Sequence, residues 1–174
     1  MDEQAGEKTS MCGAVRFVLE HPQTELAETL AVVADTPHLV ESRFWGPQPV
    51  LPVCTATGNW QVLPWGNRSE FSDIPAGGWA QRERLAQGGW ARYGATEVVI
   101  PVCAGYEQGV WFAIHTGIQG IVVHHHAGPR VYMVTEAASA AYMALTHHPR
   151  QPWLIAQSEY PVLPGSRQQL GLGL

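Results

Sequence analysis

The chain has 174 residues, of which 45% are hydrophobic and 14% are charged, and its formal net charge is -5. This length and composition suit one globular domain, and the net charge excludes a protein that is basic throughout and binds nucleic acid by bulk attraction. The 18 Gly and 13 Pro residues predict many turns between short elements, which excludes extended coiled coils and bundles of long helices.

The predicted elements follow from hydrophobic periodicity and from turn residues. Strands are expected at residues 14–19, 50–57, 60–65, 97–102, 110–115 and 153–156, and a hairpin is expected at 118–123 and 130–135 around Gly128-Pro129. Helices are expected at residues 24–34 and 136–147, with one or two helical turns at 80–87. The sum is a β-rich α+β domain with two main helices.

The two ends of the chain differ in composition from the part between them. The first ten residues are polar and lack a hydrophobic period, so we expect a disordered segment or a misassigned start of the protein. A single domain is predicted for residues 11–163 and a flexible tail for residues 164–174. No apolar run approaches the roughly 18 residues of a membrane-spanning helix, so no contact with membranes is expected.

The cysteine count indicates the cellular compartment. Three cysteines at wide spacings, Cys12, Cys54 and Cys103, favour free thiols in a reducing cytoplasm over a disulfide framework. The acidic N-terminus lacks the apolar stretch of a secretory signal. We therefore predict a cytoplasmic protein.

Cys12 lies between Met11 and Gly13 near the start of the predicted domain. If the chain begins at Cys12, this residue carries a free amine beside its thiol, groups whose unperturbed pKa values are about 8 and 8.5. Such a pair condenses with an aldehyde to an imine, and the thiol then closes a five-membered thiazolidine. The alternative role for Cys12 is that of a small buried hydrophobe.

Glu107 and His148 are candidates for proton transfer. Glu107 follows Tyr106 after a β-branched run, where burial would raise the pKa of a carboxyl group; the alternative is a solvated turn residue. His148 and Arg150 are two apart on a Pro-rich segment after the second predicted helix, so they can face one phosphate or sugar. The alternative is that His148 and Arg150 only place positive charge at the C-terminus of the helix, where it interacts favourably with the helix dipole.

The triplet His124-His125-His126 raises the possibility of a metal site. In a strand, His124 and His126 share a face, and Glu107 or His115 would supply a third ligand. The alternative is a solvated loop, since the triplet adjoins a turn.

Short motifs occur in a characteristic order along residues 11–155. They are Met11-Cys12-Gly13, the Pro-rich segment 46–53, Trp65-Gly66, the segment 101–107 that ends in Tyr106-Glu107, Thr135-Glu136-Ala137, and His148-Pro149-Arg150-Gln151-Pro152. Together they resemble the SRAP family of SOS-response-associated peptidases, or abasic-site-processing proteins. The family motif Asn-Ala-Arg-x-Glu is altered here to Trp79-Ala80-Gln81-Arg82-Glu83.

The resemblance implies a fold, an activity and a partner. The implied fold is a β-rich distorted barrel or sheet with two main flanking helices. The implied activity is capture of abasic sites in single-stranded DNA, in which Cys12 forms a thiazolidine with the ring-opened sugar and Glu107 and His148 assist proton transfer. No cofactor or metal is implied, and we expect a monomer.

The residues expected to contact DNA are Arg16, Trp65, Asn67, Arg68, Arg82 and Arg150. The arginines would hold phosphates and Trp65 would stack on a base. Four phosphate contacts by arginine predict a log–log salt slope on the order of -2 to -3 for single strands.

Four hypotheses for the function follow. The first is the crosslinking enzyme, and the second is a cysteine-dependent autopeptidase that removes residues 1–11 and exposes Cys12; the two can be consecutive steps. The third, favoured by the altered motif at Trp79, is a non-catalytic relative that binds nucleic acid or a partner. The fourth is a cupin-like metal enzyme built on His124 and His126.

Overall fold

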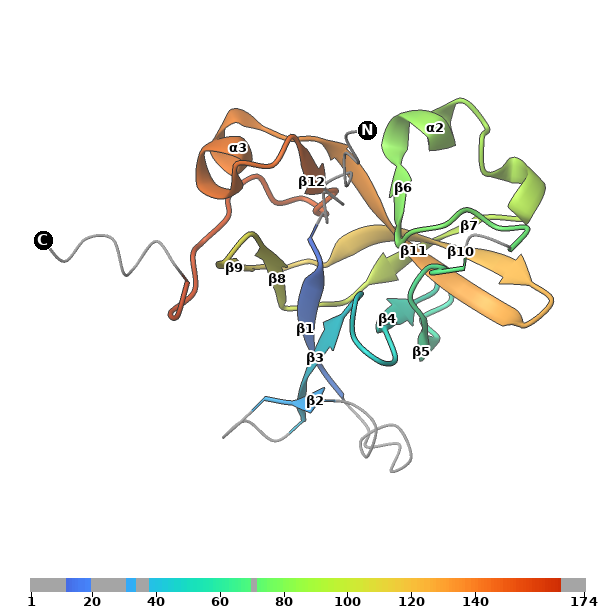
Figure 1. Cartoon of the computed structure of the whole chain (residues 1–174), viewed down its shortest axis with the longest axis horizontal. Coiled ribbons are helices and arrows are strands. Elements are labelled where there is room, and N and C mark those ends of the chain that lie inside the picture. Colours follow the sequence, from blue (N-terminus) through green and yellow to red (C-terminus); the bar gives the residue numbers. More distant parts are fainter. Residues whose placement is uncertain (1–11, 20–30, 34–37, 70–71, 167–174) are drawn as a thin grey trace, which may run out of the picture.

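The computed structural model describes residues 12–19, 31–33, 38–69 and 72–166. Two sheets form this part of the molecule, with two short helices at their upper edge in Figure 1. The predicted β-rich α+β class is confirmed. The predicted barrel is wrong, because each sheet ends in edge strands that do not pair with each other.

The first sheet has five strands in the order β2-β3-β1-β8-β9. Its strands are β1 (Ala14–Val18), β2 (Ala31–Val32), β3 (Leu39–Arg43), β8 (Ala104–Glu107) and β9 (Val110–Ala113). All of its pairings are antiparallel. The N-terminal strand of the described chain, β1, therefore lies in the middle of this sheet.

The second sheet has seven strands, six of them in the order β12-β11-β10-β7-β4-β5, with β6 pairing in parallel to β11. Its strands are β4 (Val50–Cys54), β5 (Trp60–Pro64), β6 (Trp79–Gln81), β7 (Thr96–Ile100), β10 (Ile118–His125), β11 (Gly128–Ala137) and β12 (Arg150–Pro152). The predicted hairpin is confirmed as β10–β11, with its two-residue turn at His126-Ala127.

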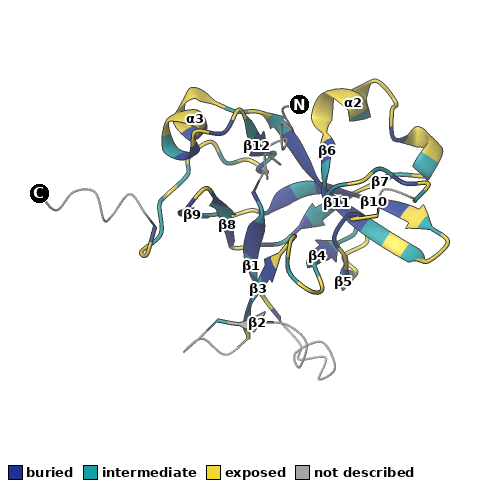
Figure 2. Cartoon of the chain, viewed as in Figure 1, coloured by how far each residue is buried: buried dark blue, intermediate teal, exposed yellow. Residues whose placement is uncertain are grey.

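The helices differ from the two that were predicted. The segment expected to be helical at 24–34 lies mostly outside the described residues, and its end at Ala31–Val32 is strand β2. The short helical segment expected at 80–87 is α2 (Arg82–Ala86), and a 3-10 turn follows at Ala91–Tyr93. Figure 2 shows α2 as mostly exposed.

The second predicted helix is shorter than its Ala-rich sequence suggested. Helix α3 covers Ala140–Thr146, because β11 continues to Ala137 and pairs there with Arg150 of β12. Ser139 caps the helix by accepting a hydrogen bond from the Tyr142 N–H at 3.1 Å, as an N-cap serine does. The expected strand at 153–156 is wrong, since the last strand is β12.

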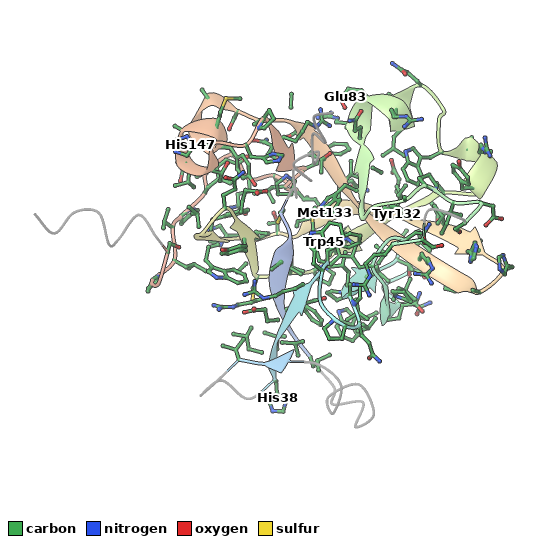
Figure 3. All side chains as sticks on the ribbon, viewed as in Figure 1. His38, Trp45, Glu83, Tyr132, Met133 and His147 are labelled. Atoms are coloured by element: carbon green, nitrogen blue, oxygen red, sulfur yellow. The ribbon has the colours of Figure 1, made fainter. Side chains whose placement is uncertain are left out.

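The core lies between and within the sheets. Its largest cluster contains Phe17, Phe44, Trp65, Phe112 and Tyr142. A second cluster surrounds Trp90 and Tyr132. In Figure 3, Tyr132 and Met133 of β11 lie centrally, whereas His38, Glu83 and His147 lie at the periphery. No helix in the described ranges has the length and apolar character needed to cross a bilayer.

Candidate functional site

Cys12 and Glu107 meet in the interior. The backbone N–H of Cys12 donates a hydrogen bond to Glu107 Oε2. Both residues are buried, with 0% and 2% of their surface exposed. The structure thus brings together two of the three residues expected to perform chemistry, and it does so through the nitrogen that would become the amine of a chain beginning at Cys12.

Strand register explains this contact. Ala14 of β1 pairs with Tyr106 of β8, so the chain just before β1 runs beside the end of β8. The β8–β9 turn then reverses tightly at Gln108-Gly109, where both residues have positive φ, 46° and 89°. Two positive φ values are typical of a type I′ hairpin turn, and this turn places Glu107 at the end of its strand.

Gly105 gives the Cys12 thiol its space. A Cβ added to Gly105 would lie 3.2 Å from Cys12 Sγ and 2.7 Å from the Phe112 ring. The second distance is shorter than carbon atoms tolerate, so a side chain at Gly105 would push Phe112 or Cys12 out of place. The glycine in the segment 101–107 is therefore required by packing, chiefly by the Phe112 ring and also by the Cys12 thiol.

Burial sets the protonation of the pair. It raises the pKa of Glu107 from 4.5 to about 7, against the opposing effect of the Cys12 N–H. Burial also raises the pKa of the Cys12 thiol beyond its usual range, and the charge of Glu107 adds to this effect. Near neutral pH the carboxyl group can therefore both accept and donate a proton, while the thiol stays protonated until a base removes its proton.

This raised pKa makes the stability of the fold depend on pH. Because folded Glu107 has a pKa of about 7 and ordinary Glu has 4.5, the folded state holds this proton more tightly than the unfolded state. The resulting stabilisation of the folded state is complete when the pH is below 4.5, the pKa of ordinary Glu. It is lost as the pH rises through about 7, the pKa of folded Glu107. Each pKa unit is worth about 1.4 kcal/mol, so the loss is on the order of 3 kcal/mol.

We therefore expect the free energy of unfolding, measured by urea titration, to fall more steeply between pH 4.5 and pH 8 in the wild type than in Glu107→Gln. The glutamine carries no proton to lose in this range. Identical pH profiles for the two proteins would contradict the raised pKa of Glu107.

Tyr142 is a polar group at this site that the sequence did not single out. Its side chain is fully buried and its hydroxyl has no hydrogen-bond partner among the described residues. Its ring packs edge-on against Phe112, with centroids 5.7 Å apart. Burial raises the pKa of Tyr142, and the charges of Cys12 and Glu107 raise it further, so the phenol remains a neutral donor.

His148 follows α3 and is also buried, with 2% of its surface exposed. Its backbone N–H donates to Thr146 Oγ1 at 3.3 Å, and that hydroxyl donates to the Tyr142 carbonyl at 2.8 Å. Its Nδ1 bonds the backbone of Arg150, while Nε2 has no partner within the described ranges. Hydrogen bonds through the Thr146 hydroxyl thus connect the backbone of His148 to the backbone of Tyr142. The structure shows no hydrogen bond from His148 to Cys12 or Glu107.

Three of the arginines expected to bind phosphate are held in ion pairs. Arg16 pairs with Glu41 at 3.1 Å and lies 4.0 Å from the centre of the Trp111 ring. Arg82 pairs with Glu136 at 2.8 Å. Arg150 reaches both carboxylate oxygens of Glu83, at 3.1 and 2.9 Å. Phosphates would therefore have to compete with carboxylates for these side chains.

Trp65 and Asn67, which were both expected to contact DNA, are buried and have structural roles in the fold. Trp65 is 1% exposed, and its Nε1 donates to the Gly78 carbonyl at 2.9 Å, so neither ring face is open to a base. Asn67 is buried, and its amide group donates to the carbonyls of Ser69 and Ile74 at 2.9 and 3.2 Å. Asn67 therefore shapes the loop that follows it.

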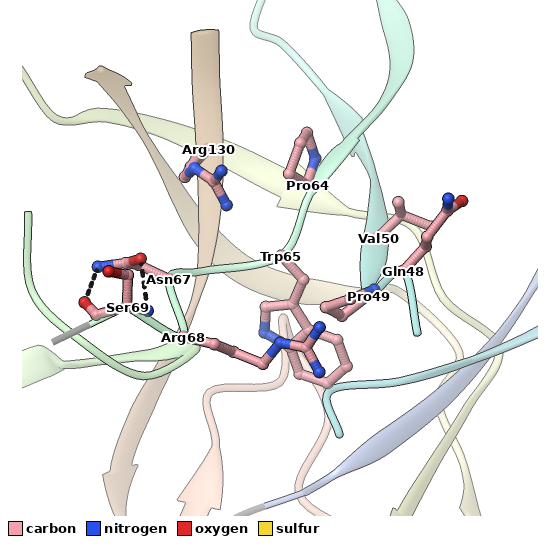
Figure 4. A pocket seen from close by; sticks show the side chains of 9 residues that line it. All are labelled: Gln48, Pro49, Val50, Pro64, Trp65, Asn67, Arg68, Ser69 and Arg130. Atoms are coloured by element: carbon pink, nitrogen blue, oxygen red, sulfur yellow. Dashed lines mark hydrogen bonds between the residues drawn. The ribbon is translucent and has the colours of Figure 1, made fainter. Parts of the chain in front are cut away.

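Arg68 and Arg130 line a pocket of about 460 Å³, shown in Figure 4. Arg68 donates to the Gly46 carbonyl at 2.7 Å and Arg130 to the Gly66 carbonyl at 2.9 Å. Neither makes an ion pair with another described residue. Arg130 lacks a local sequence signal, since it reaches this pocket only because β11 runs beside Trp65 through the bridge between Trp65 and Val131.

The predicted cupin-like ligand set is wrong. Glu107 is buried against Cys12 and is not grouped with any histidine that the structure describes. Within the described residues, a group of potential metal ligands forms elsewhere, from Asp73, His125 and His126. The tight turn at His126 explains the difference, because the strand geometry that would align His126 with His124 has ended there.

Comparisons of this chain with protein-family models, with curated proteins and with solved structures find no match.

Proposed function

We propose that this chain captures abasic sites in single-stranded DNA as a thiazolidine, through the amine and thiol of Cys12. One observation carries the proposal: the Cys12 nitrogen donates to the buried carboxyl group of Glu107. A carboxyl group with a pKa of about 7 beside a nitrogen and a thiol of one residue is suited to nucleophilic chemistry on an aldehyde.

The reaction with an aldehyde uses each group once. Glu107 takes a proton from the Cys12 ammonium group, and the free amine attacks the aldehyde carbon of the ring-opened sugar. The resulting carbinolamine loses water and leaves an imine. The thiol sulfur then bonds to the imine carbon while its proton passes to the nitrogen, which closes the five-membered ring. The net change is loss of one water molecule.

The amine must first be released from the peptide bond to Met11. In the step we propose, Cys12 Sγ attacks the Met11 carbonyl carbon, a C–S bond forms and the C–N bond breaks. The thiol proton moves through Glu107 to the departing nitrogen, and water then hydrolyses the thioester to restore the thiol. The contact between Glu107 and the Cys12 nitrogen places the carboxyl group at the atom that receives this proton.

Tyr142 and His148 supply further polar groups in this model of the reaction. Buried polar atoms nearly always have partners. The Tyr142 hydroxyl and His148 Nε2 have none among the described residues, so they suit a ligand oxygen. We assign to them hydrogen bonds to the sugar oxygens that are protonated as the ring opens and as water leaves the carbinolamine.

A second candidate is a non-catalytic binding protein. Two observations favour it: Trp79 replaces the family asparagine and packs 4.7 Å from the centre of the Phe44 ring, and Cys12 is fully buried. Such a protein would bind single strands or a partner without forming a covalent bond.

Intact-mass measurement decides between the two candidates. The full chain is incubated with a single-stranded oligonucleotide that contains one abasic site, and with a matched oligonucleotide that contains none. We expect a product whose mass is the sum of the DNA and a chain beginning at Cys12, less one water, from the abasic strand alone. Chains that retain Met1 throughout and gain no mass would support the non-catalytic candidate.

Binding should depend on salt less than the sequence suggested. Since Arg16, Arg82 and Arg150 are neutralised by carboxylates, we expect phosphate contacts chiefly from Arg68 and Arg130. Each phosphate contact contributes about -0.7 to the log–log salt slope on single strands, so two give about -1.4. Fluorescence anisotropy at several salt concentrations measures the slope. A slope near -3 would mean that the ion pairs open to receive DNA, and a slope near zero would contradict a nucleic-acid site.

A further inference from the structure

Two of the three consecutive histidines gain a partner that is distant in the sequence. His125 ends β10 and His126 begins the turn into β11. The loop before β6 brings Asp73 to the same place, where Oδ1 lies 2.8 Å from His125 Nε2. One potential ligand atom from each of the three residues lies within 4.8 Å of the other two.

We propose that Asp73, His125 and His126 bind a divalent cation of the late first transition row, such as Zn²⁺. Two imidazole nitrogens and one carboxylate oxygen form a common protein donor set for zinc, which leaves a fourth tetrahedral position for water. Asp73 and His126 are exposed, so the cation can reach the site from solvent while the core stays closed.

Packing holds this donor set together before any cation binds. The rings of His125 and His126 lie with centroids 3.8 Å apart, and Ser72 Oγ is 3.3 Å from His125 Nε2. The loop that carries Asp73 is anchored by Tyr132, whose hydroxyl donates to the Pro75 carbonyl at 2.7 Å. A ligand set on anchored segments loses less conformational entropy when it binds an ion.

The hydrogen bonds of His125 indicate which of its ring nitrogens carries the proton before a cation binds, since Nε2 faces Asp73 Oδ1 at 2.8 Å. His125 Nδ1 accepts a hydrogen bond from the exposed Ala127 N–H at 3.2 Å, which places the ring proton on Nε2. When the cation takes Nε2, that proton moves to Nδ1, and the Ala127 N–H turns to water.

His124 provides a matched control. It lies on the other side of β10, where a Cβ added to Gly94 would be 3.7 Å from His124 Cδ2, as expected from the alternation of side chains along a strand. It is exposed like His126 but does not belong to the group of ligands.

The test is calorimetric titration of Zn²⁺ into the untagged full chain, with Cys103→Ala in all samples because this exposed thiol would compete for zinc. We expect saturation at one ion per chain. His126→Ala and Asp73→Asn should each weaken the affinity by at least about tenfold, since loss of even an outer-shell partner costs that much. His124→Ala should bind as the parent does.

Both test substitutions are at exposed positions, and circular dichroism of each variant checks the fold. Absence of saturable Zn²⁺ binding to the parent overturns the proposal. A Zn²⁺ affinity in His126→Ala and Asp73→Asn that equals the affinity of the parent overturns it as well. If His124→Ala loses as much Zn²⁺ affinity as His126→Ala, the ion is bound by other ligands, and the proposal is again overturned. The proposal is independent of capture by Cys12, because His126→Ala should leave adduct formation with abasic DNA unchanged.

Discussion

Cys12→Ala should abolish the stable adduct with abasic single-stranded DNA, while non-covalent binding persists. The thiol closes the thiazolidine ring, and even in a chain that begins at position 12 the amine without the thiol forms only a reversible imine. The same substitution should stop removal of residues 1–11, because no sulfur remains to attack the Met11 carbonyl. Denaturing gel electrophoresis after heating measures the adduct, and anisotropy measures binding.

Cys103→Ala is the matched control for this experiment. Cys103 is exposed, whereas Cys12 is buried, so a thiol that reacts merely because solvent reaches it would be Cys103. We expect the control to form adduct at the wild-type rate. A heat-stable adduct in Cys12→Ala without added reductant would remove the basis of the proposed function.

Glu107→Gln should slow adduct formation by about 10²–10⁴-fold, the usual contribution of a general acid or base. The glutamine keeps the size of the side chain and still accepts the Cys12 N–H bond, but it cannot move a proton. In the wild type, the rate should rise with pH as Glu107 ionises, since the ionised form takes the ammonium proton. The rate of the variant should depend on pH only through the Cys12 amine, whose unperturbed pKa is about 8.

Mass spectrometry of samples quenched at successive times, from pH 5 to pH 9, measures the rate of adduct formation in the wild type and in Glu107→Gln. Glu97→Gln, at an exposed position on β7, controls for the general effect of removing a negative charge. Rates within a few-fold of wild type at every pH would make Glu107 a structural residue. Its contact with the Cys12 N–H would then serve packing alone.

The paired arginines have a consequence for DNA recognition. Arg150 is bound by Glu83 and also donates to the Thr135 carbonyl at 2.9 Å, while Nε2 of the nearby His148 has no hydrogen-bond partner in the described part of the chain. In the proposed function, a DNA phosphate that binds Arg150 must separate it from Glu83. The salt slope therefore reports whether the structure opens when DNA binds.

Local patterns in the sequence were sufficient for much of the secondary structure. Strands β1, β4, β5, β7 and β9 and the β10–β11 hairpin lie within or close to their predicted ranges, because β-branched runs and turn residues act over short distances. Local patterns failed at the start of α3, where pairing of Glu136 and Ala137 with β12 outweighed the helical preference of an Ala-rich segment.

The sequence by itself determined which residue types could do chemistry, since a Cys that can become N-terminal, a Glu after a β-run and a His triplet are visible as letters. Only the tertiary structure decided which of them meet. Strand register joined Glu107 to Cys12, the hairpin turn joined His125 and His126 to Asp73, and burial removed Trp65 from the surface. These contacts join residues far apart in the chain, and their geometry depends on the whole fold, which a local pattern does not contain.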